Sequence, residues 1–267
     1  MNKKIGDNRI TVLLCLIVFL SVMLLSAGID ILEQNVVSGA DRKLSFVSGC
    51  GTDAPVVSYV TENYEDDGTV VRSGRQGSGR MTFTCNVDWG EDLIPDMLEI
   101  FQEKDVKVTF FVTGSWASKN RDLLRRMYLA GHEIGSHGYG HKMCSQISED
   151  ELRSEVERTE EAIQDAIGVK PGYFAPPSGD FSSKTVEFCR ENGYRMILWS
   201  ADTIDWREGS TADVIRSRIL EKELDGAIVL MHPKEETVKA LPGLIDEIRN
   251  RGIEPVRLSE LIEQEAA

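Results

Sequence analysis

The 267-residue sequence contains no Cys-x-x-Cys pair, and its five cysteines are widely scattered. A structural zinc knuckle and a thioredoxin-like redox site both need closely spaced cysteines, so the sequence argues against both. The same scatter argues against a disulfide framework, and plain buried thiols are expected instead. The sequence also has no internal repeat. Its length allows one large α/β domain or two small ones.

Basic residues are in deficit, with 30 Lys and Arg against 44 Asp and Glu, a net charge of -14 and a pI near 4.8. Nucleic acid is therefore not an expected partner, because phosphate backbones are bound by clustered Lys and Arg. Tight binding to anionic lipid or teichoic-type polymers is also disfavoured, although this charge leaves room for a local basic patch. A neutral or cationic ligand, such as a glycan, fits better.

Charge is absent from residues 10–29, a run of twenty residues that is long enough to span the hydrocarbon core of a membrane as a helix. Lys3, Lys4 and Arg9 precede the run and Asp30 follows it, so the positive-inside rule places the N-terminus in the cytoplasm. We therefore predict a single-pass anchor over residues 1–29, with the rest of the chain outside the cell membrane. A cleaved signal peptide, which would leave a secreted protein, is the alternative, with a weak cleavage signal at residues 26–28.

Residues 30–78 show no sustained hydrophobic period and end in the Ser- and Gly-rich run 73–79. This composition predicts a stalk that ends in a flexible linker. From residue 79 to 267 the pattern alternates between apolar strands and amphipathic helices, which predicts an α/β domain with a mainly parallel sheet, open or closed into a barrel. Strands are expected at 81–87, 106–112, 194–199, 227–231 and 254–257, and helices at 92–104, 120–130, 149–167, 183–192, 211–224, 238–251 and 258–264.

The strongest chemical signal is the pair His137 and His141, which holds two of the four histidines. On one helical turn, residues four apart face the same side, so both imidazoles could reach one metal ion. The alternative is a pair of surface or capping histidines. Asp88, at the end of the first predicted strand, could complete a catalytic His-His-Asp set, or it could act as an acidic residue that favours the dipole of the following helix.

Two further polar residues follow predicted strands. His232 ends the strand 227–231 and is a candidate general acid, because imidazole titrates close to neutral pH. Asp205, in the stretch Asp202–Trp206, could orient that histidine. Taken singly, these residues could equally be a satisfied loop histidine and a solvated turn. The rigid turn 174–179 lies between a strand and a helix.

Taken in order, these motifs resemble the polysaccharide deacetylases (the NodB-homology family, carbohydrate esterase family 4). The resemblance covers residue 80 to the C-terminus and rests on the stretches 107–118, 131–141, 199–206 and 227–233. It implies a distorted, incomplete (β/α) barrel. It also implies that His137 and His141 are metal ligands, that His232 is the acid that protonates the leaving amine, and that Asp205 tunes His232. Trp206 would line the substrate groove, with Trp89, Pro176 and Ser178.

The sequence departs from the family pattern at two motifs. Where the family has Phe-Asp-Asp-Gly, this chain has Asn86 at the base position and Val87 at the position of the adjacent ligand, so Asp88 would supply the ligand from one position later. Where the family has Arg-Pro-Pro-Tyr, Ala175 replaces the arginine that orients the base. Similar variants belong to membrane-anchored, sporulation-associated deacetylase-like proteins of Gram-positive bacteria, and the resemblance to that branch is close.

The resemblance implies a hydrolase that removes N-acetyl groups from cell-wall polysaccharide, with peptidoglycan as the first candidate substrate. It also implies a divalent metal cofactor. Zinc is the first candidate for a His-His-Asp set, and cobalt and nickel are also suitable. An asparagine cannot take up a proton as a carboxylate does, and loss of a general base removes about 10²–10⁴ in rate. The alternatives are therefore a non-catalytic glycan-binding or scaffold protein, and O-acetyl esterase or another amide hydrolase activity.

Overall fold

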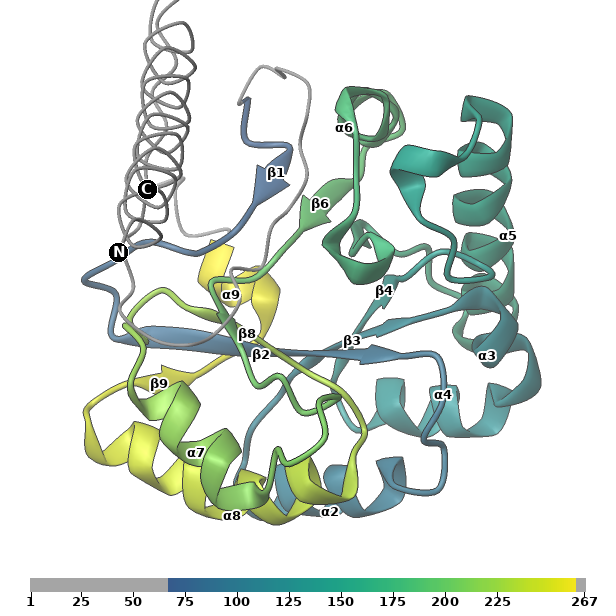
Figure 1. Cartoon of the computed structure of the whole chain (residues 1–267). Helices are drawn as coiled ribbons and strands as arrows, with labels where there is room; N and C mark the ends of the chain where they lie inside the picture. The colour runs from purple at the N-terminus through teal and green to yellow at the C-terminus, as the bar shows by residue number, and fades with distance from the viewer. Residues whose placement is uncertain (1–66, 263–267) are drawn as a thin grey trace, which may run out of the picture. The chain divides into compact units, whose positions relative to one another are not determined.

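A computed structural model describes residues 67–262, which form an α/β fold around one curled, wholly parallel sheet (Figure 1). The strand order is β1-β6-β5-β4-β3-β2-β8-β7, and β9 pairs with the first residues of β2. Because β1 and β7 stand at opposite edges, the described sheet is a half-barrel and not a closed one. The predicted α/β fold and incomplete barrel are confirmed. The strands are β1 (Val70–Val71), β2 (Arg80–Val87), β3 (Thr109–Val112), β4 (Glu133–Ser136), β5 (Tyr173–Phe174), β6 (Arg195–Ile197), β7 (Ala201–Asp202), β8 (Ile228–Met231) and β9 (Glu254–Pro255).

Most helices lie on the outside of this sheet, whereas the C-terminal helix α9 (Leu258–Ile262) packs into its hollow with Phe111 and Ile197 (Figure 1). Their positions follow the sequence signals closely where caps are strong. The longest, α5, begins after Ser148, which forms a capping box with Glu151, and it ends at Gly168 in the left-handed conformation. The α-helices are α2 (Ile94–Glu103), α3 (Gly114–Lys119), α4 (Arg121–Leu129), α5 (Glu149–Ile167), α6 (Ser183–Glu191), α7 (Ala212–Leu220), α8 (Glu235–Asn250) and α9 (Leu258–Ile262).

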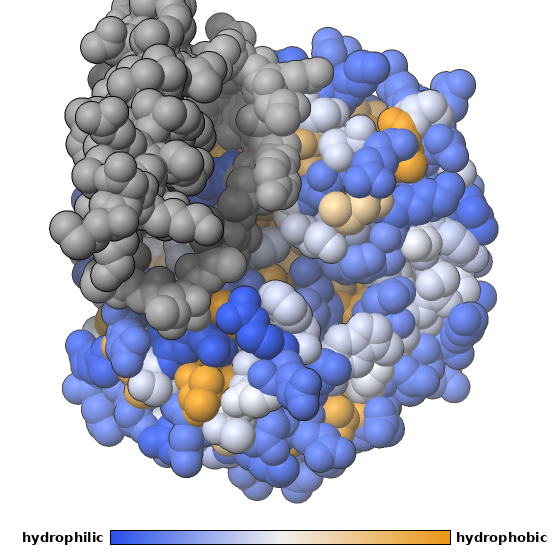
Figure 2. Space-filling view, in the orientation of Figure 1, coloured by the Kyte–Doolittle hydropathy of each residue, from blue (hydrophilic) through white to orange (hydrophobic). Residues whose placement is uncertain are grey.

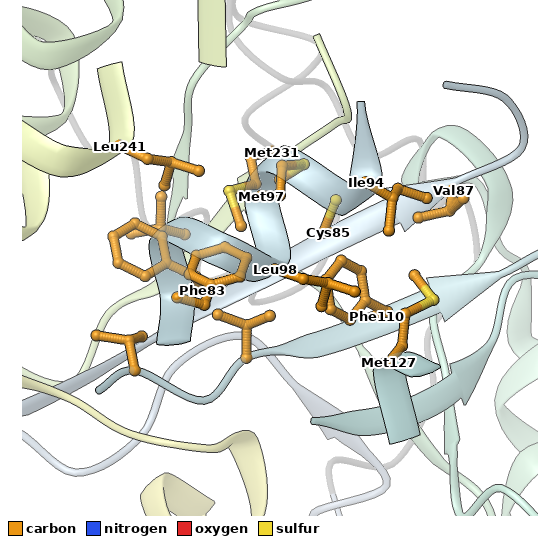
Figure 3. Packing of buried hydrophobic residues seen from close by; sticks show 14 of the residues in the cluster. Phe83, Cys85, Val87, Ile94, Met97, Leu98, Phe110, Met127, Met231 and Leu241 are labelled. Atoms are coloured by element: carbon orange, nitrogen blue, oxygen red, sulfur yellow. The ribbon is translucent and has the colours of Figure 1, made fainter. Parts of the chain in front are cut away.

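Strand β2 divides its side chains between two environments, because successive residues of a strand point to opposite faces. Phe83, Cys85 and Val87 pack against the helices, together with Met97 of α2 (Figure 3). The other face of β2 carries Arg80, Thr82, Thr84 and Asn86 into the hollow of the half-barrel. The polar face of this one strand therefore runs from one end of the barrel to the other.

The predicted linker is wrong for the part of it that the structure describes. Val70 and Val71 form β1, which pairs with β6, and Gly74 donates a backbone hydrogen bond to the carbonyl of Gly226. The Asp225 carboxylate accepts hydrogen bonds from the backbone N–H groups of Gly77 and Gly79, which fixes the glycine-rich run in place. The domain therefore begins before residue 79.

The predicted membrane segment, residues 10–29, and the stalk up to residue 66 lie outside the described residues. Between residues 67 and 262, none of the helices combines the length and the apolar character that a membrane span requires.

Candidate active site

The polar motifs gather at one end of the sheet because all of its strands are parallel. Asp88 follows β2, His137 follows β4, and His232 follows β8. Asp205 comes three residues after β7, which pairs with β8. The carboxyl ends of parallel strands form the usual site of chemistry in such folds.

His232 and Asp205 form a tight pair. The Asp205 carboxylate faces the imidazole Nδ1 of His232 at 2.8 Å and also accepts a hydrogen bond of 2.7 Å from the His232 backbone N–H. The hydroxyl of Thr237, in the first turn of α8, donates a third hydrogen bond of 2.7 Å to the same carboxylate. Because Nδ1 faces a carboxylate, the proton is assigned to Nδ1 in the neutral ring, which leaves Nε2 available for chemistry.

Burial raises the pKa of Asp205, but hydrogen bonds and charge from His232, together with the Thr237 hydroxyl, outweigh it and lower the pKa overall. The Asp205 side chain is 0% exposed, whereas the His232 side chain is 19% exposed. The carboxylate is therefore held ionised under a histidine whose ring reaches the surface. Such a carboxylate orients the imidazole through its Nδ1 atom.

The turn that delivers Asp205 is strained. Ile204 has a φ of 50°, in the left-handed region that a β-branched residue rarely adopts. Its backbone N–H donates to the Asp202 carboxylate at 2.7 Å, and its carbonyl accepts from the Ser210 hydroxyl at 2.7 Å. Surrounding contacts that stabilise an unfavourable backbone are typical of active sites.

The histidine pair comes together in a different way from the prediction. Residues 137–143 form a loop and not a helical turn, and two positive φ angles, 72° at Gly138 and 55° at His141, fold it back on itself. The ring centroids of His137 and His141 are 5.0 Å apart, in an edge-to-face arrangement. The two histidines are close together, as predicted, but turns of the backbone bring them together instead of helical periodicity.

The buried His137 ring is held in one orientation. Its Nδ1 lies 2.7 Å from the carbonyl oxygen of Ala175, so Nδ1 carries the proton and Nε2 is the free donor atom. Burial, followed by the charge of nearby His141, lowers the pKa of His137 to about 3. Metal-binding histidines commonly have a carbonyl partner of this kind.

Contacts from two helices hold the histidine loop. At the start of α3, the backbone N–H groups of Gly114 and Ser115 donate to the carbonyls of Gly138 and Tyr139. From α5, the buried Glu155 carboxylate accepts from the Gly140 N–H at 2.7 Å. The Arg158 guanidinium carbon lies 3.6 Å from the centre of the Tyr139 ring. The loop is therefore clamped from both sides.

Asp88 does not join the two histidines. Its Oδ1 accepts a hydrogen bond of 2.7 Å from the Thr113 hydroxyl, and the residue is exposed. No three His, Cys, Asp or Glu side chains within residues 67–262 are placed to hold a metal ion together. The donor chemistry of His137 and His141 fits a divalent cation, but the third ligand is not in position. Two of the three predicted metal ligands, His137 and His141, are therefore brought together, and Asp88 is not.

Asn86 lies where the alternation of β2 predicts, on the face toward the hollow, and it is 6% exposed. Its side-chain oxygen is buried with no hydrogen-bond partner among the described residues. Val87, at the position of the family's adjacent ligand, points the opposite way, into the hydrophobic core. It therefore has neither the donor atom nor the direction of a metal ligand. Ala175 offers no side-chain group that could orient Asn86.

A groove of about 780 Å³ opens beside His232, and three loops line it. Trp89, which stacks on the His232 ring at 6.2 Å, and Trp206 both contribute, with 38% and 55% of their surfaces exposed. Of the other two predicted substrate contacts, Pro176 is buried, whereas Ser178 is exposed with a φ of 57°. Exposed indole faces are suited to stacking on sugar rings.

Several supporting residues could not be predicted from local sequence patterns. Thr237 binds Asp205, Thr113 binds Asp88, and Glu155 holds the histidine loop. Thr237 lies 32 positions from Asp205, Thr113 lies 25 from Asp88, and Glu155 lies 15 from Gly140, so spacing alone carries no signal for them. Their common feature is burial of a polar side chain beside a strand end.

Known proteins share the sequence motifs and the fold of this chain. Residues 74–197 match the polysaccharide deacetylase family model. A solved structure described as a family 4 carbohydrate esterase (CE4) pseudoenzyme from Bacillus anthracis is 35% identical, with a TM-score of 0.70, over 72% of this chain and 68% of that one. The chain belongs to the polysaccharide deacetylase family. Deacetylases of this family are hydrolases that act on amide bonds of acetylated glycans and are generally metal-dependent.

Two curated relatives extend the comparison. Protein YlxY of Bacillus subtilis is 35% identical over 194 residues, which are 73% of this chain and 60% of the relative. A peptidoglycan-N-acetylglucosamine deacetylase of Bacillus cereus is 31% identical over 183 residues, 66% of each chain. The chain thus spans just under two thirds of the length of these relatives.

Proposed function

We propose that this protein removes N-acetyl groups from the amino sugars of peptidoglycan, with His232 as the general acid. The observation that carries the proposal is the His232–Asp205 pair, in which three hydrogen bonds converge on one buried carboxylate. Hydrolysis of an N-acetyl group requires protonation of the departing amine. A histidine beside an ionised carboxylate can act as the acid in that step. The named deacetylase of Bacillus cereus supports the choice of substrate.

In this proposal each residue of the acid half has a distinct task. Asp205 fixes the Nδ1–H tautomer and stabilises the imidazolium, so that the transferable proton resides on Nε2 of His232. Thr237 keeps the carboxylate oriented. Trp89, stacked against the imidazole, and Trp206 bind the faces of the glycan chain and exclude water from one side of the groove.

We propose that the cofactor is a divalent metal, with zinc as the first candidate, held by His137, His141 and Asp88. Such an ion supplies Lewis-acid polarisation of the acetyl carbonyl when it is bound. Asp88 would bind through Oδ2, because its Oδ1 accepts the hydrogen bond from Thr113. The carbonyl partner of His137 supports the histidine part of the set.

The proposed location is the outer side of the cell membrane, close to the cell wall. The uncharged run 10–29 and the preceding Lys3, Lys4 and Arg9 support a membrane anchor, or a leader if the segment is cleaved. Protease treatment of intact cells that produce the tagged chain tests this. Digestion of the C-terminal domain is expected without lysis, and protection until lysis would contradict it.

A second candidate function is glycan binding without turnover. Asn86 at the base position, with its unbonded buried oxygen, favours it, as does the relative described as a pseudoenzyme. A mutant of that pseudoenzyme is described as having restored enzymatic activity, so the fold tolerates both states.

The deciding experiment measures acetate release by the full chain from peptidoglycan and from chitooligosaccharides, with zinc or cobalt and with a chelator control. We expect slow, chelator-sensitive release that His232→Gln abolishes and His132→Gln, a histidine remote from the groove, leaves intact in the folded fraction. No release by folded, metal-loaded protein, together with retained glycan binding, would establish the second candidate.

A further inference from the structure

A second pocket lies at the opposite end of the half-barrel from His232. Its volume is about 360 Å³, within the range of small-ligand sites. Arg80 opens β2 and Arg195 opens β6, so the pocket lies at the amino ends of the parallel strands. We call it the arginine pocket, lined by Arg75, Arg80 and Arg195 with Ser73, Ser78 and Leu261 among its other walls.

Strand alternation turns two of the three arginines toward the hollow of the barrel. Arg80 shares its face of β2 with Asn86, opposite the core residue Met81. Arg195 shares its face of β6 with Ile197, which packs against Val71 in the interior cluster. The side chains therefore converge because the sheet curls, although the residues are 115 positions apart in sequence.

These three guanidinium groups have no hydrogen bond or ion pair within residues 67–262. Most other cations of the described chain have one. Arg190, Arg216 and Arg249 are paired with carboxylates, for example. In a protein with a net charge of -14, carboxylates are plentiful. Three unpaired arginines in one pocket are therefore a local reversal of the charge of the molecule.

The walls of the pocket are held in place by the fold. The Asp225 carboxylate accepts hydrogen bonds from the Ser78 hydroxyl and from the backbone N–H of Gly79, so the loop beside Arg75 is anchored. One carboxylate, that of Glu260, also lines the pocket, and it is already bound by the Arg257 guanidinium. The positive charge of the pocket is thus left largely uncompensated.

We propose that the arginine pocket binds a phosphate group. Guanidinium groups present forked N–H donors that match the oxygens of phosphate, and three of them carry enough positive charge to offset a doubly charged anion. Elsewhere, the face of the molecule drawn in Figure 2 is largely hydrophilic, with small, separate apolar patches. The phosphate group belongs either to a soluble compound or to a phospholipid headgroup.

The test uses the full chain in detergent and isothermal titration calorimetry with inorganic phosphate, pyrophosphate and glycerol 1-phosphate at matched ionic strength. We expect one binding site, weakened at least ~10-fold by the double substitution Arg80→Gln and Arg195→Gln, since charge-assisted hydrogen bonds are lost. Arg126→Gln is the matched control, because Arg126 is exposed on α4, outside the pocket, with the same charge. It is expected to leave the affinity unchanged.

The source of the phosphate is decided in nanodiscs. Hydrogen exchange of residues 71–80 in the full chain is compared between discs of phosphatidylcholine alone and discs that also contain phosphatidylglycerol. Added protection with phosphatidylglycerol identifies the headgroup, and binding of soluble probes without added protection identifies a soluble ligand. The proposal is overturned if none of the three soluble compounds binds and phosphatidylglycerol adds no protection. It is also overturned if binding survives the double substitution Arg80→Gln and Arg195→Gln in protein with an unchanged melting temperature.

Discussion

The two halves of the candidate site differ in how completely they are built. Around His232, the Asp205 carboxylate has three hydrogen bonds and the ring is oriented from two directions. Around His137, the imidazole is oriented, but Asp88 binds Thr113 and the Asn86 oxygen has no partner among the described residues. The acid half is preorganised, whereas the half that should activate the nucleophile lacks a base and a third ligand. Under the proposed function, the fold keeps the residues for proton delivery in place although the residues for activation of the nucleophile are incomplete.

Removing Asp205 should break the acid half with the largest effect. Asp205→Ala leaves the His232 N–H and the Thr237 hydroxyl without their acceptor in a buried position. Loss of one partner of a buried pair costs about 3–5 kcal/mol, so a lower free energy of unfolding is expected in urea titrations. Glu208→Ala, in the same loop but exposed, is the control. A stability equal to that of the parent would show that the pair is a weak surface contact.

Restoring the base should reduce the difference between the halves. Asn86→Asp places a carboxylate on the same face of β2, and we expect acetate release to rise by about 10²-fold, the lower end of what a general base contributes. Asn86→Ser is the matched control that adds no base. An unchanged rate in a folded variant would show that the missing base is not the limiting defect.

The buried His132, which lies outside the candidate site, should make the stability of the fold depend on pH. His132 is buried, accepts the Val108 N–H through Nδ1, and has a pKa lowered to about 4, first by burial and then by Lys107. Because the unfolded chain binds this proton near pH 6.5 and the folded chain does not, stability should fall as pH drops from 6.5 toward 4, by about 1.4 kcal/mol per pH unit. The stability of His132→Gln, measured by urea titration across this range, should show a shallower slope by that amount. An identical slope in the variant would assign the acid sensitivity to other groups.

Substitution of Asp88 tests whether its carboxylate is the third metal ligand. We expect Asp88→Asn to weaken zinc binding about 10-fold by calorimetry, which is the effect of losing one ligand from a weak set. Asp92→Asn, a neighbouring carboxylate in the groove lining, should leave the affinity unchanged. Equal affinities for parent and Asp88→Asn would define a two-histidine site.

The smallest effect is expected in the groove. Trp206→Ala removes the more exposed indole, and binding of chitooligosaccharides should weaken by about 5-fold without a change in melting temperature. Val214→Ala, another exposed apolar side chain, is the control. Unaltered glycan affinity would place the sugar chain elsewhere.

Local signals were enough to predict much of the fold. The amphipathic run 149–167, with Ser148 before it and Gly168 after it, predicts α5, and the structure gives the same bounds. The apolar runs of β2 and β8 are long enough to indicate buried strands. The short strands β5 and β7, two residues each, carry too little pattern to be recognised, since their pairing comes from neighbours in the sheet.

The sequence alone predicted five of the nine described strands, seven of the eight described α-helices, the polar residues that follow the strands, and the substitutions at Asn86 and Ala175. Tertiary structure alone decided that His137 and His141 meet through a loop, that Asp88 turns to Thr113, and that Arg80 and Arg195 share a pocket. Spacing along the chain reports which residues share one element. Contacts between elements depend on how the sheet curls and on which partner satisfies each buried polar group, and neither is written in local spacing.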